Sequence, residues 1–253
     1  MSEQTSKDGS PTVVLVHGAF ADASSWTGVI ELLQAEGVKV TAPANPLRGI
    51  AHDSAYIESV LEQTPGPIVA VGHSYGGAVI SNAATEAKNV VGLVFVAAFA
   101  PEEGETLGGA EQASKDSVLN SALVPLHYPS ADGGKPGLEF VIDPKRLHDA
   151  FAADLPTEQT ALMGATQRPV AEAAFSEPSG PPAWRHLPSW AVVATGDKAA
   201  GADVIRSMAV RAGATITEVE GSHVIMISQP QAVTDVILDA VAAVGTVPAT
   251  VGA

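Results

Sequence analysis

Short apolar runs alternate with amphipathic stretches along most of the chain. Runs without polar positions are typical of strands buried on both faces of a parallel sheet. Between them, apolar residues recur every three or four positions, as in helices with one buried face. The predicted strands are residues 12–17, 38–42, 67–71, 91–97, 190–195 and 215–219. The predicted helices are residues 24–36, 52–63, 74–87, 203–211 and 228–244.

Local signals mark where two of these helices begin and which sides they bury. Ser24 or Ser25 is expected to cap the first helix, since serine hydroxyls accept hydrogen bonds from free N–H groups there. His52 or Asp53 is expected to open the second. The side chains expected to point inward are Trp26, Val29, Ile30 and Leu33 on the first helix, and Tyr56, Ile57, Val60 and Leu61 on the second.

The alternation of strands and helices predicts an α/β fold with a six-stranded, mostly parallel sheet flanked by helices. Residues 101–187 interrupt it, being rich in Pro, Gly and Ser, with short helical patterns at 145–153 and 157–164 and no convincing strand. We expect a helical cap inserted over the carboxyl ends of the strands, where ligands bind in open α/β sheets. The expected division is a disordered leader (1–11), a core (12–100 and 188–244), the cap (101–187) and a flexible tail (245–253).

The segment Val-Ala-Val-Gly-His-Ser-Tyr-Gly-Gly-Ala at 69–78 joins a predicted strand to a predicted helix with almost no loop. Its Gly72-x-Ser74-x-Gly76 spacing is that of a nucleophile elbow. Such a turn forces the central residue to a positive φ, and glycines two positions away prevent collisions between backbones. Ser74 would stand at a helix N-terminus, which favours developing negative charge. It is the predicted nucleophile.

A serine nucleophile needs a base and an acid, which follow it along the chain in this kind of hydrolase. His223 fits the base because it follows a predicted strand and precedes the last helix. Asp197 follows the strand at 190–195 and is the preferred acid. The other carboxylates considered for this role are Asp203, Glu102 and Glu103.

The oxyanion formed during acyl transfer needs two backbone N–H donors. Tyr75, directly after the nucleophile, is expected to supply one, and Ala19 the other, with Phe20 as the alternative. Phe20, Tyr128 and Trp184 are expected to contact substrate. His17 and His73 are expected to shape the oxyanion turn and the elbow. Other cap candidates for the pocket are His127, Phe140, Met163 and His186.

These residues together resemble the α/β-hydrolase superfamily over residues 12–244. The matching segments are His17-Gly18-Ala19, the elbow, Asp197 and Gly221-Ser222-His223. More narrowly, the chain resembles the small-capped branch of plant methyl-ester esterases, hydroxynitrile lyases and bacterial carboxylesterases. The resemblance implies a serine hydrolase without cofactors that cleaves carboxylic esters through an acyl-enzyme. A hydroxynitrile lyase and a small-molecule receptor that keeps the triad are the alternatives.

Two positions favour the esterase over the lyase. In the lyases of this branch a Thr replaces the Gly of the His-Gly turn, and a Lys after the catalytic His holds the departing cyanide. Gly18 and Val224 stand at these positions here. A cation from the cap could still replace that lysine, and the candidates are Lys145, Arg146 and Arg185.

The amino-acid composition limits the kinds of molecule that the protein is expected to bind. The 253 residues carry a net charge of −15, with 13 Lys and Arg, so no basic patch for nucleic acid is expected. With no cysteine there is no disulfide, cysteine-ligated zinc or cysteine nucleophile, and no other metal-ligand spacing or phosphate loop is evident. The polar leader and the short longest apolar run, residues 90–100, predict a cytoplasmic protein without membrane contact. The oligomeric state stays open, with a homodimer as one option.

Overall fold

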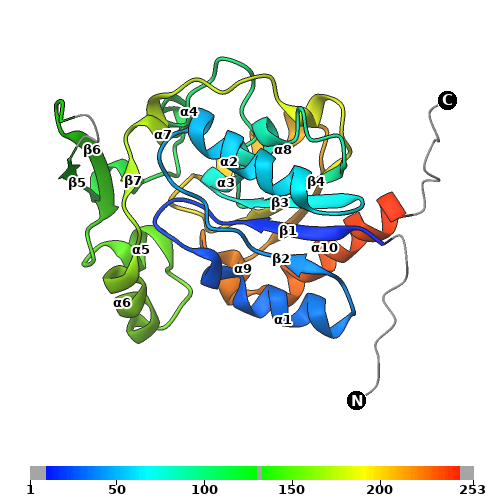
Figure 1. Cartoon of the computed structure of the whole chain (residues 1–253). Coiled ribbons are helices and arrows are strands. Elements are labelled where there is room, and N and C mark those ends of the chain that lie inside the picture. Colours follow the sequence, from blue (N-terminus) through cyan, green and yellow to red (C-terminus); the bar gives the residue numbers. More distant parts are fainter. Residues whose placement is uncertain (1–9, 130–132, 246–253) are drawn as a thin grey trace.

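The computed structural model describes residues 10–129 and 133–245 and contains the predicted parallel sheet (Figure 1). Its six strands run in the order β2-β1-β3-β4-β8-β9, and every neighbouring pair is parallel. The bounds are β1 Thr12–Val16, β2 Val40–Thr41, β3 Ile68–His73, β4 Val90–Val96, β8 Ser189–Ala194 and β9 Thr215–Val219. The predicted strand count and parallel arrangement are confirmed.

Helices cover both faces of this sheet (Figure 1). One face carries α1 (Thr27–Ala35) and α10 (Pro230–Gly245), and the other carries α2 (Ile50–Gln63), α3 (Tyr75–Ala83) and α8 (Ala202–Arg211). Each helix packs against the sheet through the apolar face that its sequence predicts.

One inward side chain was predicted wrongly. In α2 the buried stripe is Ser54, Ile57 and Leu61, spaced by three and four residues, and Tyr56 beside it is 46% exposed. The helix also begins at Ile50, earlier than expected, so Asp53 lies within its first turn and is fully buried.

Two helix ends also differ from expectation. A short 3₁₀ helix (η1, Ala23–Trp26) precedes α1, and its cap is Asp22, whose side chain accepts a hydrogen bond from the Ser24 N–H at 2.7 Å. The last predicted helix, 228–244, begins at Pro230 as α10, and Ser228 instead ends a separate short helix, α9 (Ile225–Ser228). Pro230 begins α10 because proline has no N–H to donate and suits the first position of a helix.

The insertion between β4 and β8 is only partly helical. The predicted helical patterns are present as α5 (Leu147–Phe151) and α6 (Thr157–Thr166), accompanied by α4 (Leu107–Ala113), η2 (Leu119–Ala122), α7 (Ala173–Ser176) and η3 (Ala183–Arg185). The expectation that it holds no strand is wrong, since it contains an antiparallel sheet of β5 (Leu123–Tyr128), β6 (Gly137–Ile142) and β7 (Val170–Ala171). β5 is an edge strand with a central Pro125 and largely exposed side chains, so its sequence lacks a strand pattern.

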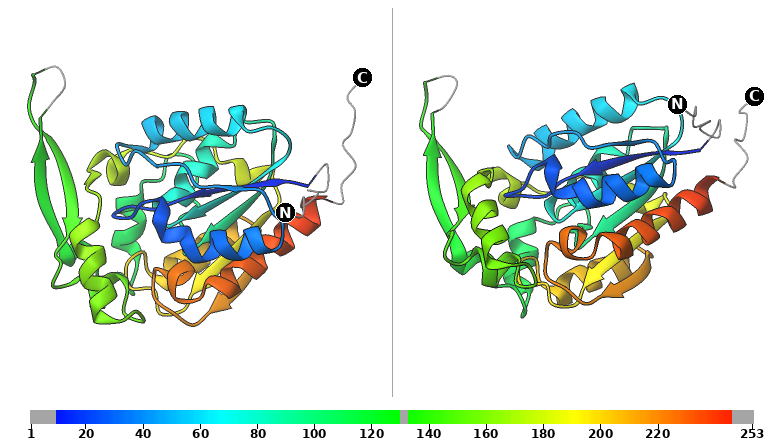
Figure 2. Two further views of the ribbon diagram at one scale, coloured as in Figure 1. Left: turned by 60° about the horizontal axis from the view of Figure 1, so that its bottom comes forward. Right: turned by 90° about the horizontal axis from the view of Figure 1, so that it is seen from below.

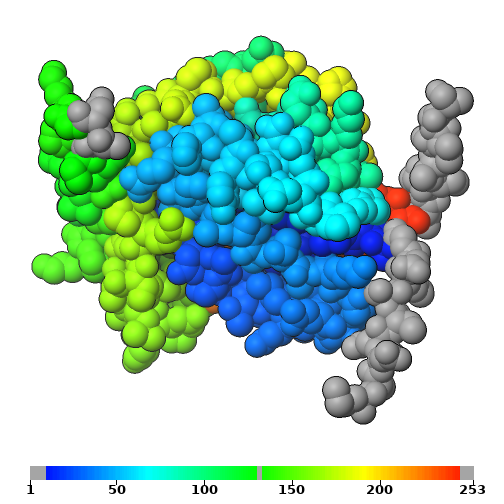
Figure 3. Space-filling view, viewed as in Figure 1, coloured from blue at the N-terminus to red at the C-terminus, as the bar shows by residue number. Residues whose placement is uncertain are grey.

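This insertion lies at one end of the sheet, and the last turn of α10 lies at the other (Figure 2). The β5–β6 hairpin projects from the body, as the space-filling view also shows (Figure 3). Within residues 10–129 and 133–245, no helix is long and apolar enough to cross a bilayer. The leader and tail fall outside the described residues except for Ser10, Pro11 and Gly245, and their disorder, like the cytoplasmic location, stays a prediction.

Candidate active site

Ser74 occupies the turn between β3 and α3 with φ 53° and ψ −123°. A Cβ at Gly72 would lie 2.5 Å from the Gly76 carbonyl oxygen, and one at Gly76 would collide with the carbonyl oxygen of Val16. Both positions therefore require glycine. A non-glycine residue in this conformation costs about 1–3 kcal/mol. The tight strand-to-helix turn predicted from the sequence is present.

His223 and Asp197 form a buried pair beside this turn. His223 lies between β9 and α9, and its Nδ1 is 2.7 Å from Asp197 Oδ2. The other Asp197 oxygen accepts hydrogen bonds from the N–H groups of Ala199 and Ala200 at 2.9 and 3.0 Å. With Nδ1–H donated to the carboxylate, the Nε2 atom of His223 is left to exchange a proton.

A narrow cavity of about 10 Å³, room for little more than one water molecule, brings the predicted groups together. Ser74 and His223 line it, as do Ala19 and Tyr75, the residues expected to supply N–H donors. As the first residue of α3, Tyr75 has no intrahelical acceptor for its N–H. The rest of the wall is mostly apolar and includes Phe20, Phe99, Leu107, Leu119, Phe151 and Phe175.

His17 fixes the turn that carries Ala19. Its Nδ1–H donates to the Gly18 carbonyl oxygen at 2.9 Å, and its Nε2 accepts from the Asn45 N–H at 2.9 Å. Burial lowers the pKa of His17 to about 4, which keeps the ring neutral and able to accept. From the insertion, Arg168 donates its backbone N–H to Phe20 at 3.2 Å and its guanidinium to Asn45 at 2.9 Å. Asn45 and Arg168 were missed by the sequence analysis because no motif marks them.

The loop that carries His223 is held from two sides. His73 Nε2–H donates to the His223 carbonyl oxygen at 2.9 Å. Burial lowers the pKa of His73 well below its ordinary value, so the ring stays neutral. From the insertion, Asp154 accepts hydrogen bonds from the Ser222 N–H at 2.9 Å and from the Ser222 hydroxyl. The insertion therefore helps to position the loop and also supplies part of the cavity wall.

The Tyr75 side chain is committed elsewhere. Its hydroxyl donates to Asp53 Oδ2 at 2.8 Å, and the Arg48 N–H reaches the same carboxylate oxygen at 3.0 Å. Burial, together with the Asp53 charge, raises the pKa of Tyr75 far above its ordinary value. The phenol thus stays protonated, and Tyr75 offers the cavity its backbone donor.

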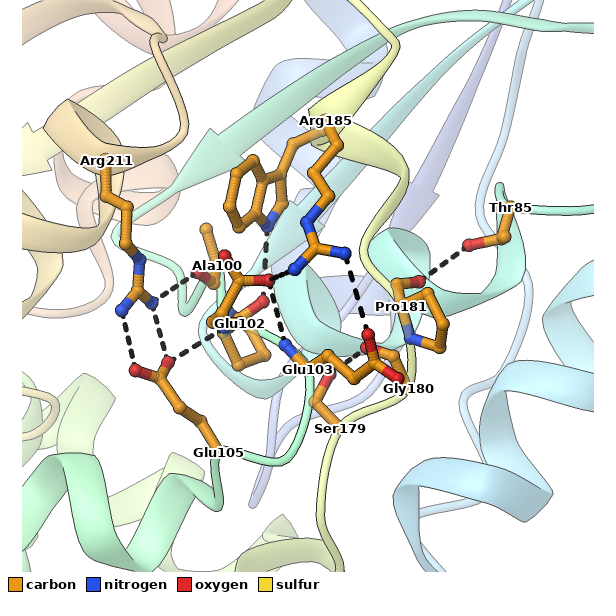
Figure 4. Close-up of polar contacts among 12 residues, drawn as sticks. Thr85, Ala100, Glu102, Glu103, Glu105, Ser179, Gly180, Pro181, Arg185 and Arg211 are labelled. Atoms are coloured by element: carbon orange, nitrogen blue, oxygen red, sulfur yellow. Dashed lines mark hydrogen bonds and ion pairs between the residues drawn. The ribbon is translucent and has the colours of Figure 1, made fainter.

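The alternative acids have other partners. Asp203 accepts hydrogen bonds from the Ser114 hydroxyl at 2.5 Å and from the Lys115 N–H at 2.9 Å. Figure 4 shows Glu102 and Glu103 facing Arg185, at 2.5 and 3.6 Å. Of the four carboxylates considered, Asp197 alone contacts His223 within the described residues.

Two residues expected to contact substrate do not line the cavity. The Tyr128 ring lies beneath the Arg48 guanidinium, 5.0 Å from its carbon, at the end of β5. The Trp184 indole N–H donates to the Pro101 carbonyl oxygen at 3.2 Å. Phe20 does line the cavity, and its contact with substrate stays a prediction.

A further residue in the cavity wall was not anticipated. Glu111 on α4 is only 4% exposed, and its Oε1 has no hydrogen-bond partner among the described residues. Burial, and secondarily the charge of Asp197, raises the pKa of Glu111 to about 8. No sequence signal marks it, because it lies in a short, weakly patterned helix.

Comparison with known proteins gives consistent relatives. A 173-residue stretch, 62% of this chain, is 27% identical to the putative chloroplastic methylesterase 11 of Arabidopsis thaliana and spans 44% of that relative's length. The structure of polyneuridine aldehyde esterase matches with a TM-score of 0.76 and 23% identity, over 91% of this chain and 98% of that one. A pyrethroid hydrolase from Sphingobium faniae JZ-2 matches with a TM-score of 0.73 and 24% identity, over 92% and 98% of the two chains. The sequence profile of the Alpha/beta hydrolase family matches residues 13–236. The chain belongs to the Alpha/beta hydrolase family.

Proposed function

We propose that this protein is a cofactor-free serine hydrolase that cleaves carboxylic esters through an acyl-enzyme. The observation that carries this proposal is the 2.7 Å contact between His223 and Asp197 beside a cavity that Ser74 also lines. The relatives named as a methylesterase, an esterase and a pyrethroid hydrolase support an ester as substrate.

In this mechanism the Ser74 hydroxyl attacks the ester carbonyl and passes its proton to Nε2 of His223. Asp197 stabilises the resulting imidazolium, and the N–H groups of Ala19 and Tyr75 donate to the oxyanion. The alcohol leaves with the proton from His223. Water then attacks the acyl-enzyme, giving its proton to His223, and Ser74 regains a proton as the acid departs.

The cavity favours this chemistry over cyanohydrin cleavage. A departing cyanide would need a charge partner, since an unpaired buried anion is costly. Val224, directly after His223, is apolar and buried. Among the cations considered, Arg146 bonds to Ser121, Arg185 pairs with Glu102, and neither they nor Lys145 line the cavity.

The decisive experiment combines turnover with labelling. A panel of p-nitrophenyl esters of increasing acyl length should be hydrolysed, and a fluorophosphonate should label Ser74. Ser74→Ala should lose at least about 10⁴-fold in kcat and all labelling while remaining folded. Ser81→Ala is the matched control, because Ser81 is a buried serine on α3 whose hydroxyl has no hydrogen-bond partner among the described residues.

Ligand binding without turnover would instead favour the receptor. In that case a small molecule would raise the melting temperature while no ester was consumed. An unlabelled Ser74, or a Ser74→Ala variant as active as wild type, would contradict the proposal.

A further inference from the structure

Glu111 is a buried carboxyl group without a hydrogen-bond partner for Oε1 among the described residues. Buried polar groups are nearly always paired, so an unpaired one calls for an explanation. It lines the same cavity as Ser74 and His223, among the apolar side chains of Leu107, Leu119 and Phe175. The missing partner is therefore best sought in a molecule that enters the cavity.

Glu111 also stands where a substrate would pass. Together with Phe175 it lines both the cavity and a wider groove of about 370 Å³, whose wall includes Leu123 of β5 and Phe140 of β6. Thr106, Asn120 and Glu172 are among the residues of that groove. A molecule that reached from the groove to Ser74 would run along the Glu111 carboxyl.

The surroundings favour the neutral acid over the carboxylate. Asp197 is the charged group that acts on Glu111, and its negative charge opposes ionisation. His223 lies in the same cavity wall and is bonded to Asp197. The titratable groups on the elements packed against α4 are Asp203, Arg206 and Arg211 on α8, and Glu172 directly before α7. Of these, Asp203 is held by Ser114 and Lys115, Arg206 by Glu218 and Arg211 by Glu105, while Glu172 lines the outer groove.

A protonated carboxyl group can donate a hydrogen bond to an oxygen atom and accept one from a hydroxyl. Resting on the proposed ester hydrolysis, we propose that Glu111 determines specificity by hydrogen bonding to a second oxygen function of the substrate. The substrate class is thus an ester that carries a hydroxyl, ketone or ether oxygen besides its ester group. A purely alkyl ester would leave Glu111 unpaired when bound, and such sites discriminate strongly against analogues that lack the bonding group.

The test compares matched esters on the full chain. Ethyl butanoate is paired with ethyl 3-hydroxybutanoate and ethyl 3-oxobutanoate, and methyl pentanoate with methyl 4-oxopentanoate and methyl 3-methoxypropanoate. An added oxygen changes the intrinsic reactivity of an ester, so kcat/KM values for two esters cannot be compared directly. The measured quantity is therefore the kcat/KM of the oxygenated ester divided by that of its alkyl partner, and this ratio is compared between wild type and variant. Glu111→Leu should lower this ratio about tenfold for at least one pair, which is the effect of one lost hydrogen bond. Glu111→Gln should keep most of it, since an amide both donates and accepts.

A pH series separates the hydrogen bond from a merely structural role. In the wild type the ratio should fall as the pH rises through about 8, because Glu111 then loses its donor proton. In Glu111→Gln it should stay level over the same range. Glu86→Gln, which changes an exposed carboxyl that lines neither the cavity nor the groove, should behave as wild type. If Glu111→Leu does not fold, the pH response of Glu111→Gln decides.

The outcomes distinguish this inference from the proposed function. Unchanged ratios in Glu111→Leu, with Ser74 still labelled and esters still hydrolysed, would overturn the inference alone. A preference for ammonium-bearing esters that grows above pH 8 would also overturn it, because that is carboxylate chemistry. Absence of both labelling and turnover would overturn the proposed function and this inference with it.

Discussion

His73 donates its Nε2–H to the carbonyl oxygen of His223 at 2.9 Å, so the residue before the elbow serine holds the backbone of the proposed base. The two imidazole rings also pack together, with centroids 4.8 Å apart. His73 is fully buried, and nothing in the described residues partners its Nδ1. This hydrogen bond suits His73 to positioning His223, while burial, which lowers its pKa, makes it a poor second base.

Replacing His73 with Phe should lower kcat about tenfold or more with a much smaller change in KM. Without its donor, the His223 loop is free to shift, and small misplacements of a catalytic group are known to be costly. His73→Gln should retain more activity than His73→Phe, since its amide nitrogen can reach toward the same carbonyl. Steady-state kinetics of both variants, with melting temperatures as the folding control, provide the test. Equal losses in the two variants would indicate that packing alone matters.

The choice of acid gives a second prediction. Asp197→Asn should lower kcat by a factor on the order of 10³–10⁴, because an amide in that place no longer stabilises the imidazolium and can select the wrong tautomer. Asp203→Asn removes a carboxylate that caps a loop near Ser114, so its effect on kcat should be small. Esterase assays of the two variants side by side decide, and a larger loss in Asp203→Asn would mean that the acid is misassigned.

The core could be predicted from the sequence because its signals are local. Strands such as β3 and β4 are buried on both faces and read as unbroken apolar runs. The elbow is recognisable in the sequence because positions 72 and 76 have no room for a side chain and must be glycine. Ser74, Asp197 and His223 each follow a predicted strand, so the sequence alone indicates that they lie at strand ends.

The insertion could not be predicted in the same way. β5 and β6 pair with each other at the edge of the molecule, so the alternation that marks a half-buried strand is weak. Contacts such as Asp154 with Ser222 join residues 68 positions apart, and no short pattern records them. Glu111 enters the cavity only through the packing of α4 against α7 and α8. Tyr128 and Trp184, aromatic residues chosen by type alone, therefore lie outside the cavity wall.

A third prediction concerns the choice between ester and cyanohydrin. The protein should hydrolyse p-nitrophenyl acetate and release no more cyanide from mandelonitrile than buffer does. Gly18 leaves no room for a substrate-binding threonine, since a Cβ there would lie 2.7 Å from the Ser74 Cβ. Cyanide release well above the background with no ester turnover would reverse this assignment. Ser74→Ala serves as the blank for both substrates.

The buried carboxyl of Glu111 yields a last prediction, about stability. Its pKa is raised from an ordinary 4.5 to about 8. Between these values the unfolded chain releases a proton that the folded chain retains, so the free energy of unfolding falls as the pH rises and levels off above about 8. Each unit of pKa corresponds to roughly 1.4 kcal/mol, which puts the full effect at a few kcal/mol.

Glu111→Gln removes this ionisation and should therefore be more stable than wild type at pH 8, with the advantage shrinking toward pH 4.5. Urea unfolding of both proteins at pH 4.5, 6 and 8 measures the difference in their free energies of unfolding. The contributions of the other titrating groups are the same in both proteins and largely cancel in this difference. Glu172→Gln is the matched control, since Glu172 is exposed and its replacement should leave the pH dependence unchanged. A constant difference between Glu111→Gln and wild type across this range would show that Glu111 ionises in the folded protein as readily as in the unfolded chain. A gain in stability at pH 8 in Glu111→Gln, together with a loss of substrate preference in Glu111→Leu, would mark Glu111 as a group kept for function at the expense of the fold.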